Sequence, residues 1–203
     1  HVGVRPAVAI SDASGRPLRR ALVSRYRLGE ADVVGVLDGE LEAGTRYGVD
    51  GVTRYTGAAG PQAGRDVRIR LPRAGLVVNA RTGESFGRTD TVSTRLVAGD
   101  ALVLTITPQA AEVTLAGPAS AATGSHPTFT VRAAHLVRVH VFGPDGRFLP
   151  EYAANLLPRD GSARFVVPSA VDDPPGVYRI VATDVLTGAR AQAELSLVAT
   201  QSQ

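Results

Sequence analysis

Residues 66–71 read Asp66-Val67-Arg68-Ile69-Arg70-Leu71, and charged and apolar side chains alternate there almost without a break. Successive side chains of a β-strand point to opposite faces of the sheet. The pattern therefore predicts a strand that buries Val67, Ile69 and Leu71 and leaves the two arginines in solvent. No stretch of the chain holds a helical period for long. These observations indicate an all-β fold.

Similar short segments lie on both sides of this strand, and turn residues separate them. Gly and Pro contribute 22 and 13 of the 203 residues, which is typical of many strands joined by tight turns. A break is expected at Pro72, a half-buried strand over 21–28, and a short helix or helical turn over 151–157. The other predicted strands cover residues 7–10, 76–80, 91–97, 101–106, 112–116, 128–133, 136–142, 163–167, 177–184 and 191–198.

The spacing of these strands predicts two tandem β-sandwich domains of the immunoglobulin-like kind. The first module is expected over residues 1–109 and the second over residues 110–203. Within the first module the alternation weakens at residues 43–64, where seven residues are Gly or Pro. This irregular loop is either a floppy insertion or the first module's binding surface, because long loops in compact domains are often functional.

Composition excludes several classes of protein. The chain is 44% hydrophobic and 20% charged, which is typical of globular domains, and it has no cysteine for disulfides or thiolate metal sites. All 22 basic residues are arginine, but the net charge is only +3 and no basic run exceeds Arg19-Arg20. We therefore expect no nucleic-acid partner. Apolar runs such as residues 33–37 are too short to insert into a membrane.

Two sets of segments resemble a known family. Residues 26–37, 67–72 and 81–90 resemble the β-sandwich that follows the catalytic barrel in large bacterial β-galactosidase-like glycoside hydrolases. Residues 175–188, which begin Pro-Gly-Val-Tyr-Arg-Ile-Val, are similar to the last strands of immunoglobulin-like modules appended to such enzymes and to other exported bacterial proteins. The resemblance implies an accessory region. The catalytic carboxylates of that family lie on its barrel, so no catalytic residue is carried over.

The residues themselves predict no catalytic or metal site. Asp172 and Asp173 are adjacent and precede two prolines, so they are expected in a turn, unlike the paired carboxylates of a glycosidase. No Gly-x-Ser-x-Gly nucleophile motif occurs. Alternation places His135 and His140 on opposite strand faces, and His126 lies in a connection, so no shared zinc site is expected. We predict a protein that is not an enzyme and has no cofactor.

Aromatic residues make up only 5% of the chain, and tryptophan is absent. Tyr47 and Tyr55, in the irregular segment, are the one candidate pair of platforms for stacking on a sugar ring, although packing tyrosines are the simpler interpretation. Tyr178 is expected to be buried in its strand or to form a tyrosine corner. The phenylalanines expected in the second core are Phe129, Phe142 and Phe165.

The leading hypothesis is a non-catalytic accessory or structural pair of modules, in a larger exported bacterial protein, that acts as a spacer or a protein-interaction region. The chain opens at His1 rather than Met, which favours a removed leader or a piece of a longer chain. The expected partners are other domains of that chain or identical subunits, with polysaccharide as a further candidate, at an extracellular or cell-surface location. The alternatives are a subunit of a filament, stalk or surface layer that assembles by strand addition, and a carbohydrate-binding module.

Overall fold

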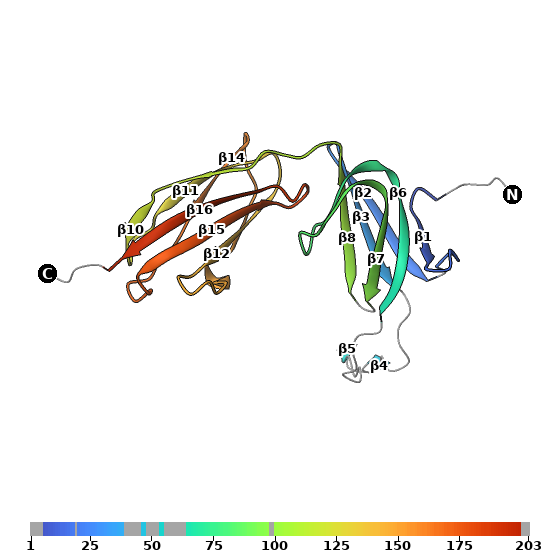
Figure 1. The fold of residues 1–203 in the computed structure, drawn as a ribbon, viewed down its shortest axis with the longest axis horizontal. Helices are drawn as coiled ribbons and strands as arrows, with labels where there is room; N and C mark the ends of the chain where they lie inside the picture. Colours follow the sequence, from blue (N-terminus) through green and yellow to red (C-terminus); the bar gives the residue numbers. More distant parts are fainter. Residues whose placement is uncertain are drawn as a thin grey trace. The chain divides into compact units, whose positions relative to one another are not determined.

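The computed structural model describes residues 6–18, 20–38, 46–47, 53–54, 64–97 and 100–199. The chain divides into two compact units, His1–Pro108 and Gln109–Gln203 (Figure 1). The boundary between them lies one residue before the boundary predicted from the sequence. Apart from one 3-10 turn, the regular structure in those ranges consists of strands, which confirms the all-β prediction. The same ranges contain no helix with the length and apolar character that a membrane crossing requires.

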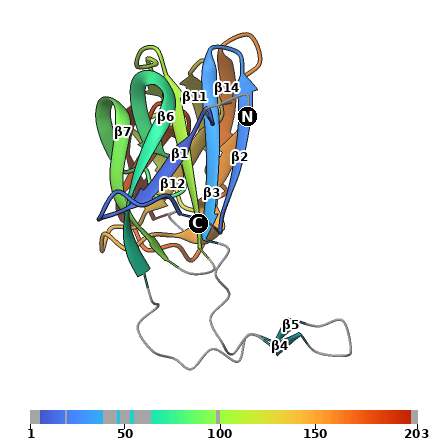
Figure 2. The same cartoon turned by 90° about the vertical axis from the view of Figure 1, so that its right-hand side faces the viewer.

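The first unit is one antiparallel sheet that curls around its own apolar face (Figure 2). Its strands are β1 (Ala9–Asp12), β2 (Ala21–Leu28), β3 (Ala31–Asp38), β6 (Gly64–Asn79), β7 (Ser85–Val97) and β8 (Ala101–Thr107). They are ordered β1-β6-β8-β3-β2, and β7 pairs with β6 as well. A separate pair is formed by β4 (Arg46–Tyr47) and β5 (Thr53–Arg54).

The long strand β6 belongs to both layers of this unit. Residues 67–70 pair with β1 and residues 76–79 pair with β8, while β7 follows β6 with a register shift between Arg70 and Gly75. The strand can therefore turn the sheet over onto itself, and the apolar side chains of both halves share one core. The members of this core are Val8, Ile10, Val34, Val36, Val67, Ile69, Leu71, Val77, Val92, Leu96, Leu102, Leu104 and Ile106.

The predicted break at Pro72 is wrong, because β6 continues through it. Proline has no N–H to donate to a ladder, and it lies within the register shift, where β6 leaves its pairing with β7. The pairing of β6 with β7 resumes at Gly75, whose backbone also lies very close to β8. A Cβ there would lie 2.6 Å from Ile106 Cγ2 and 2.8 Å from the Thr107 carbonyl oxygen, so only glycine fits without a shift of the neighbouring strand.

Strand β2 has the predicted bounds, but the prediction that it is half-buried is wrong. Every residue from Leu22 to Leu28 is exposed. The reason is the position of β2 at the end of the sheet order, a position that alternation within 21–28 does not reveal. In the described part of the chain, β2 pairs with β3 alone.

The second unit is a two-sheet sandwich. Its strands are β9 (Thr114–Ala116), β10 (Ser120–Ala122), β11 (Thr128–Arg132), β12 (Val137–Phe142), β13 (Ala154–Leu156), β14 (Ser162–Val166), β15 (Gly176–Asp184) and β16 (Arg190–Val198). One sheet has the order β10-β16-β15-β12-β13 and the other has the order β14-β11-β9. All pairs are antiparallel except β10 with β16, which is parallel. This is the immunoglobulin-like arrangement that the sequence predicts.

The core of the second unit contains a tyrosine corner, one of the two alternatives expected for Tyr178. Tyr178 is 1% exposed, and its hydroxyl donates a hydrogen bond of 2.9 Å to the carbonyl oxygen of Pro174, four residues earlier. This bond ties the start of β15 to the turn before it. Phe129 and Phe165 are buried in the same core, as expected.

One expectation for this unit is wrong, and another is confirmed only in part. Phe142 is only half-buried and lies outside the core cluster, because core residues Val137, Val139 and Val141 take the inward positions of β12. The short helix or helical turn expected over 151–157 is present as a turn, but it is shorter than that range and begins one residue earlier. It is a single 3-10 turn at Pro150–Tyr152, and the chain then extends into β13, which pairs with β12.

Candidate interaction site

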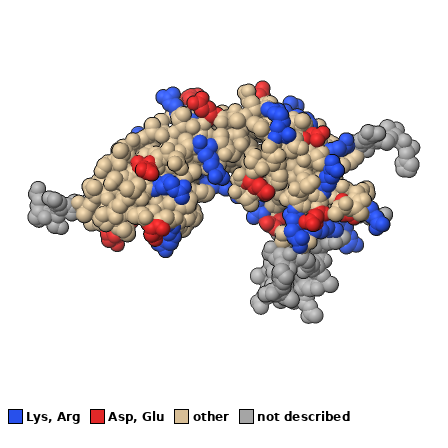
Figure 3. Space-filling model, in the orientation of Figure 1, with Lys and Arg blue, Asp and Glu red and all other residues tan. Residues whose placement is uncertain are grey.

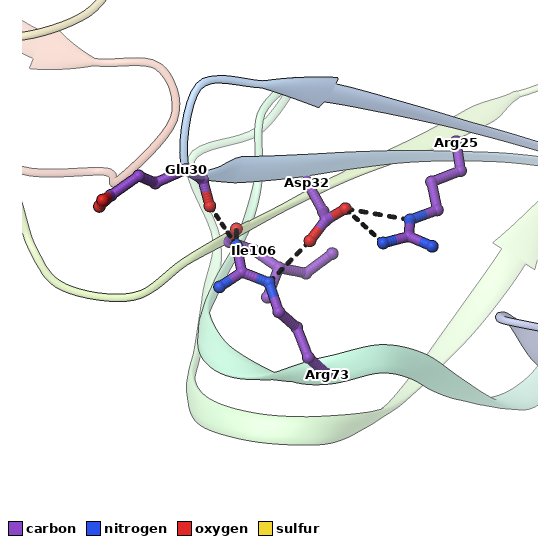
Figure 4. A network of polar contacts seen from close by, with 5 residues as sticks. All are labelled: Arg25, Glu30, Asp32, Arg73 and Ile106. Carbon is purple, nitrogen blue, oxygen red and sulfur yellow. Dashed lines mark hydrogen bonds and ion pairs between the residues drawn. The ribbon is translucent and has the colours of Figure 1, made fainter.

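Among the described residues of the first unit, the most deeply buried ionisable group is Asp32, on β3, which is 1% exposed (Figure 4). Its Oδ1 accepts hydrogen bonds from Arg25 Nε at 3.0 Å and Nη2 at 2.8 Å, and its Oδ2 accepts one from Arg73 Nε at 2.7 Å. Burial would raise the pKa of this carboxyl, but the bonds from Arg73 and Arg25 outweigh burial and hold the pKa below its ordinary value.

The same network holds β6 within its register shift, where Arg73 lies. Arg73 also donates to the carbonyl oxygens of Glu30 and of Ile106, the latter at 3.2 Å. One guanidinium therefore joins β6, the β2–β3 turn and β8 (Figure 4). All three polar partners are part of the framework of the sheet, so the network is structural.

A second ion pair lies where the irregular segment leaves and rejoins the sheet. Arg65 Nε donates to Asp38 Oδ2 at 2.7 Å, and the two residues belong to the end of β3 and the start of β6. The candidate sugar platforms fall in that segment. Tyr47 is the second residue of β4, but its side chain and the whole of Tyr55 lie outside the described residues, so this site stays a prediction.

The candidate carboxylates of the second unit are held in turns. Asp173 accepts hydrogen bonds from the Tyr152 hydroxyl at 2.7 and 2.9 Å and from the backbone N–H of Ala170 at 2.9 Å. Burial, with the bond to Asp173, raises the pKa of Tyr152 to about 12. Among the described residues, no three His, Asp or Glu side chains are arranged so that they could hold a metal ion.

The histidines are found on different parts of the second unit. His135 lies 3.0 Å through Nδ1 from Oδ2 of the fully buried Asp184. His140, on β12, packs edge-on against Phe148, with ring centroids 4.9 Å apart. Arg179 lies over the ring of Phe142, with its Cζ 4.0 Å from the centroid. Sequence reasoning assigned Phe142 to the core and so missed this mixed aromatic and cationic surface.

The feature of the first unit best suited to bind another molecule is the free edge of β2. Its outward side carries Leu22, Tyr26 and Leu28, which are 63%, 67% and 60% exposed. On the other face Val23, opposite the buried Val36, is still 44% exposed. Large apolar side chains on both faces of a terminal strand are unusual, because such edges promote pairing with another chain.

An apolar groove of about 580 Å³ runs beside this edge, between β1 and β2. Ile10 lines it from β1 and Val8 from the bend just before β1, and Ala21 and Val23 line it from β2. Arg68 and Arg70 line it from β6, and both side chains are exposed. The groove lies between β1 and β2, the two ends of the sheet order, which do not pair with each other.

Comparison with known proteins gives no family for the chain. No family model matches it, and no curated protein does. Among solved structures it is similar to a chimeric titin Z1Z2–Z1Z2 tandem, at 14% identity over 96% of this chain and 84% of that one, with a TM-score of 0.29. It is also similar to titin domains Z1Z2 in complex with telethonin, at 13% identity, 97% and 82% coverage and a TM-score of 0.28. The fold assignment rests on the strand order and the two cores described above.

Proposed function

We propose that the chain is a non-catalytic pair of accessory modules in a larger exported bacterial protein related to glycoside hydrolases, where it acts as a spacer or protein-interaction region. The observation that carries this proposal is the contrast between the interior and the edge of the first module. Its buried ion pairs hold strands together, whereas the large apolar side chains exposed among its described residues all lie on the terminal strand β2.

The resemblance of residues 26–37 and 175–188 to modules of exported bacterial enzymes supports the parent protein and the extracellular or cell-surface location. The partners on this proposal are other domains of the parent chain. Arginine and carboxylate side chains are interspersed on the face drawn in Figure 3, with uncharged surface between them. A surface that binds nucleic-acid phosphates would carry a continuous stripe of positive charge. The mixed charges of this face are more typical of a surface that contacts other proteins.

The open reading frame that encodes the chain tests this proposal. We expect a catalytic barrel in the same frame, and deletion of residues 1–203 should leave the barrel's turnover number unchanged while it lowers the barrel's thermal stability or its retention at the cell surface. A frame that encodes only this chain behind a leader peptide would contradict the proposal.

The free edge of β2 also favours a second candidate function, a subunit of a filament, stalk or surface layer that assembles by strand addition. Sedimentation velocity distinguishes the two candidates. The accessory pair should sediment as a monomer at every concentration, whereas a filament subunit should form a ladder of larger species as its concentration rises.

A further inference from the structure

We propose that the β2 edge and the adjoining groove accept an extended, acidic segment of a partner protein as an added β-strand. The proposal rests on the proposed function as a protein-interaction region and names the chemistry of the partner. Three observations support it: an unpaired strand edge, an apolar groove beside it, and an excess of arginine around both.

The first observation is the open hydrogen-bonding side of β2. All eight of its residues pair with β3 on one side, and in the described part of the chain no strand pairs with the other side. Alternate N–H and C=O groups of a strand point to each side, so a run of this length offers a partner several backbone hydrogen bonds.

The second observation is the apolar groove beside β2, together with the exposed apolar side chains of that strand, which the side chains of an added strand would contact. Along β2, alternation places Leu22, Tyr26 and Leu28 on one face, and Val23 on the face that lines the groove. An added strand would extend both faces. One set of its side chains would cover the exposed apolar residues, and the other set would enter the mouth of the groove.

The third observation is charge. Arg25 and Arg27 lie on the same face of β2 as Val23, and Arg25 shares its one carboxylate with Arg73. Arg27, Arg68 and Arg70 are exposed, and no carboxylate pairs with any of them among the residues that the structure describes. A partner strand that alternates acidic with small apolar residues would neutralise this excess and fill the groove.

A second copy of β2 fits the site less well. Symmetric antiparallel pairing of two β2 strands would place Arg25 and Arg27 of both copies on one face of the joined sheet. Like charges that face each other across neighbouring strands destabilise the pair. The charge of the site therefore favours a partner of opposite sign over self-association.

The test uses the 203-residue chain and a dye-labelled peptide of eight residues that alternates Glu with Val and Thr. Fluorescence anisotropy at low ionic strength should show saturable binding, and added salt should weaken it. A peptide with Lys in place of Glu should not bind. In amide hydrogen exchange, the added peptide should slow the exchange of β2 amides.

Two N-methylated versions of the peptide separate strand addition from simple charge attraction. One carries methyl groups on the N–H groups of one edge and the other on those of the opposite edge. Strand addition predicts that one version loses binding and the other retains it, because only one edge of the added strand pairs with β2. Equal binding of both versions would contradict the proposal.

Charge-reversal variants locate the site. Arg27→Glu combined with Arg70→Glu should weaken binding about tenfold, because attraction at two exposed positions becomes repulsion. Arg164→Glu, at an exposed position of the second unit, is the matched control and should bind like the unmodified chain. Unchanged affinity in the double variant overturns the inference, as does self-association of the chain that the acidic peptide does not reverse. If the chain is monomeric and does not bind the peptide, this inference is wrong but the proposed function is not affected. The accessory role is tested separately, by the open reading frame.

Discussion

At the scale of single residues, the buried carboxylates of this chain are structural. Asp32 receives one guanidinium group from the adjacent strand β2 and another from β6, which is distant in sequence, and its place as the second residue of β3 gives no sign of this. Asp184 accepts the backbone N–H groups of Leu186 and Thr187 at 3.0 and 2.9 Å and so shapes the turn after β15. Sequence alternation predicts which residues face inward, but not which charges meet there.

Replacement of Asp32 by asparagine should destabilise the first unit by about 2 kcal/mol, because the Arg25 and Arg73 side chains lose the anion that compensates them. Since the pKa of Asp32 is lowered on folding, its contribution is present above the ordinary carboxyl pKa and is lost as the pH falls through the folded value. Urea unfolding between neutral and acidic pH measures both effects. Asp100→Asn removes an exposed partner of Arg81 and should change stability by less than about 1 kcal/mol.

Tyr152 should give the second unit a sensitivity to alkali. Its pKa is raised to about 12 in the folded state, so its contribution is fully present below the ordinary tyrosine pKa and is lost as the pH rises from there through the folded pKa. Tyr152→Phe should flatten the fall in melting temperature that begins above the ordinary tyrosine pKa. If the melting temperature of the variant falls with pH as steeply as that of the unmodified chain, another group causes the sensitivity. Tyr178 is the first alternative, because its pKa is also raised, chiefly by burial.

At the scale of elements, the bend of β6 decides the shape of the first unit. Gly75→Ala should destabilise that unit by about 1–3 kcal/mol, because the added methyl group overlaps Ile106 and the backbone at Thr107. Thermal unfolding followed by circular dichroism measures the loss. Gly87→Ala is an informative comparison, since it tests positive φ where nothing lies within 4 Å of the added carbon.

Much of the strand pattern can be predicted from alternation, and the remainder depends on neighbours in space. The strands at β11, β12, β15 and β16 lie within one residue of their predicted bounds. Alternation does not report whether a strand is central or terminal, so the exposure of β2 was missed. It also gave no signal for the groove, whose two sides come from strands that do not pair.

At the scale of the whole molecule, two separate cores imply two folding units. Residues 1–108 and 109–203, each produced alone, should unfold cooperatively with a midpoint close to the corresponding transition of the intact chain, because each encloses its own apolar cluster. Differential scanning calorimetry of the three proteins checks this. A half that lacks a cooperative transition would show that its core is incomplete without the other half.

The parallel pairing of β10 with β16 has a mechanical consequence. These strands are joined over Ser120–Ala122 and residues 196–198, close to the two ends of the second unit. Tension applied to those ends pulls the two strands in opposite directions along their length, so the bonds between them, including Thr123 N–H to the Val198 carbonyl at 2.9 Å, are loaded together rather than opened one by one. Stretching a single molecule of the second unit should therefore meet its main resistance at the pairing of β10 with β16.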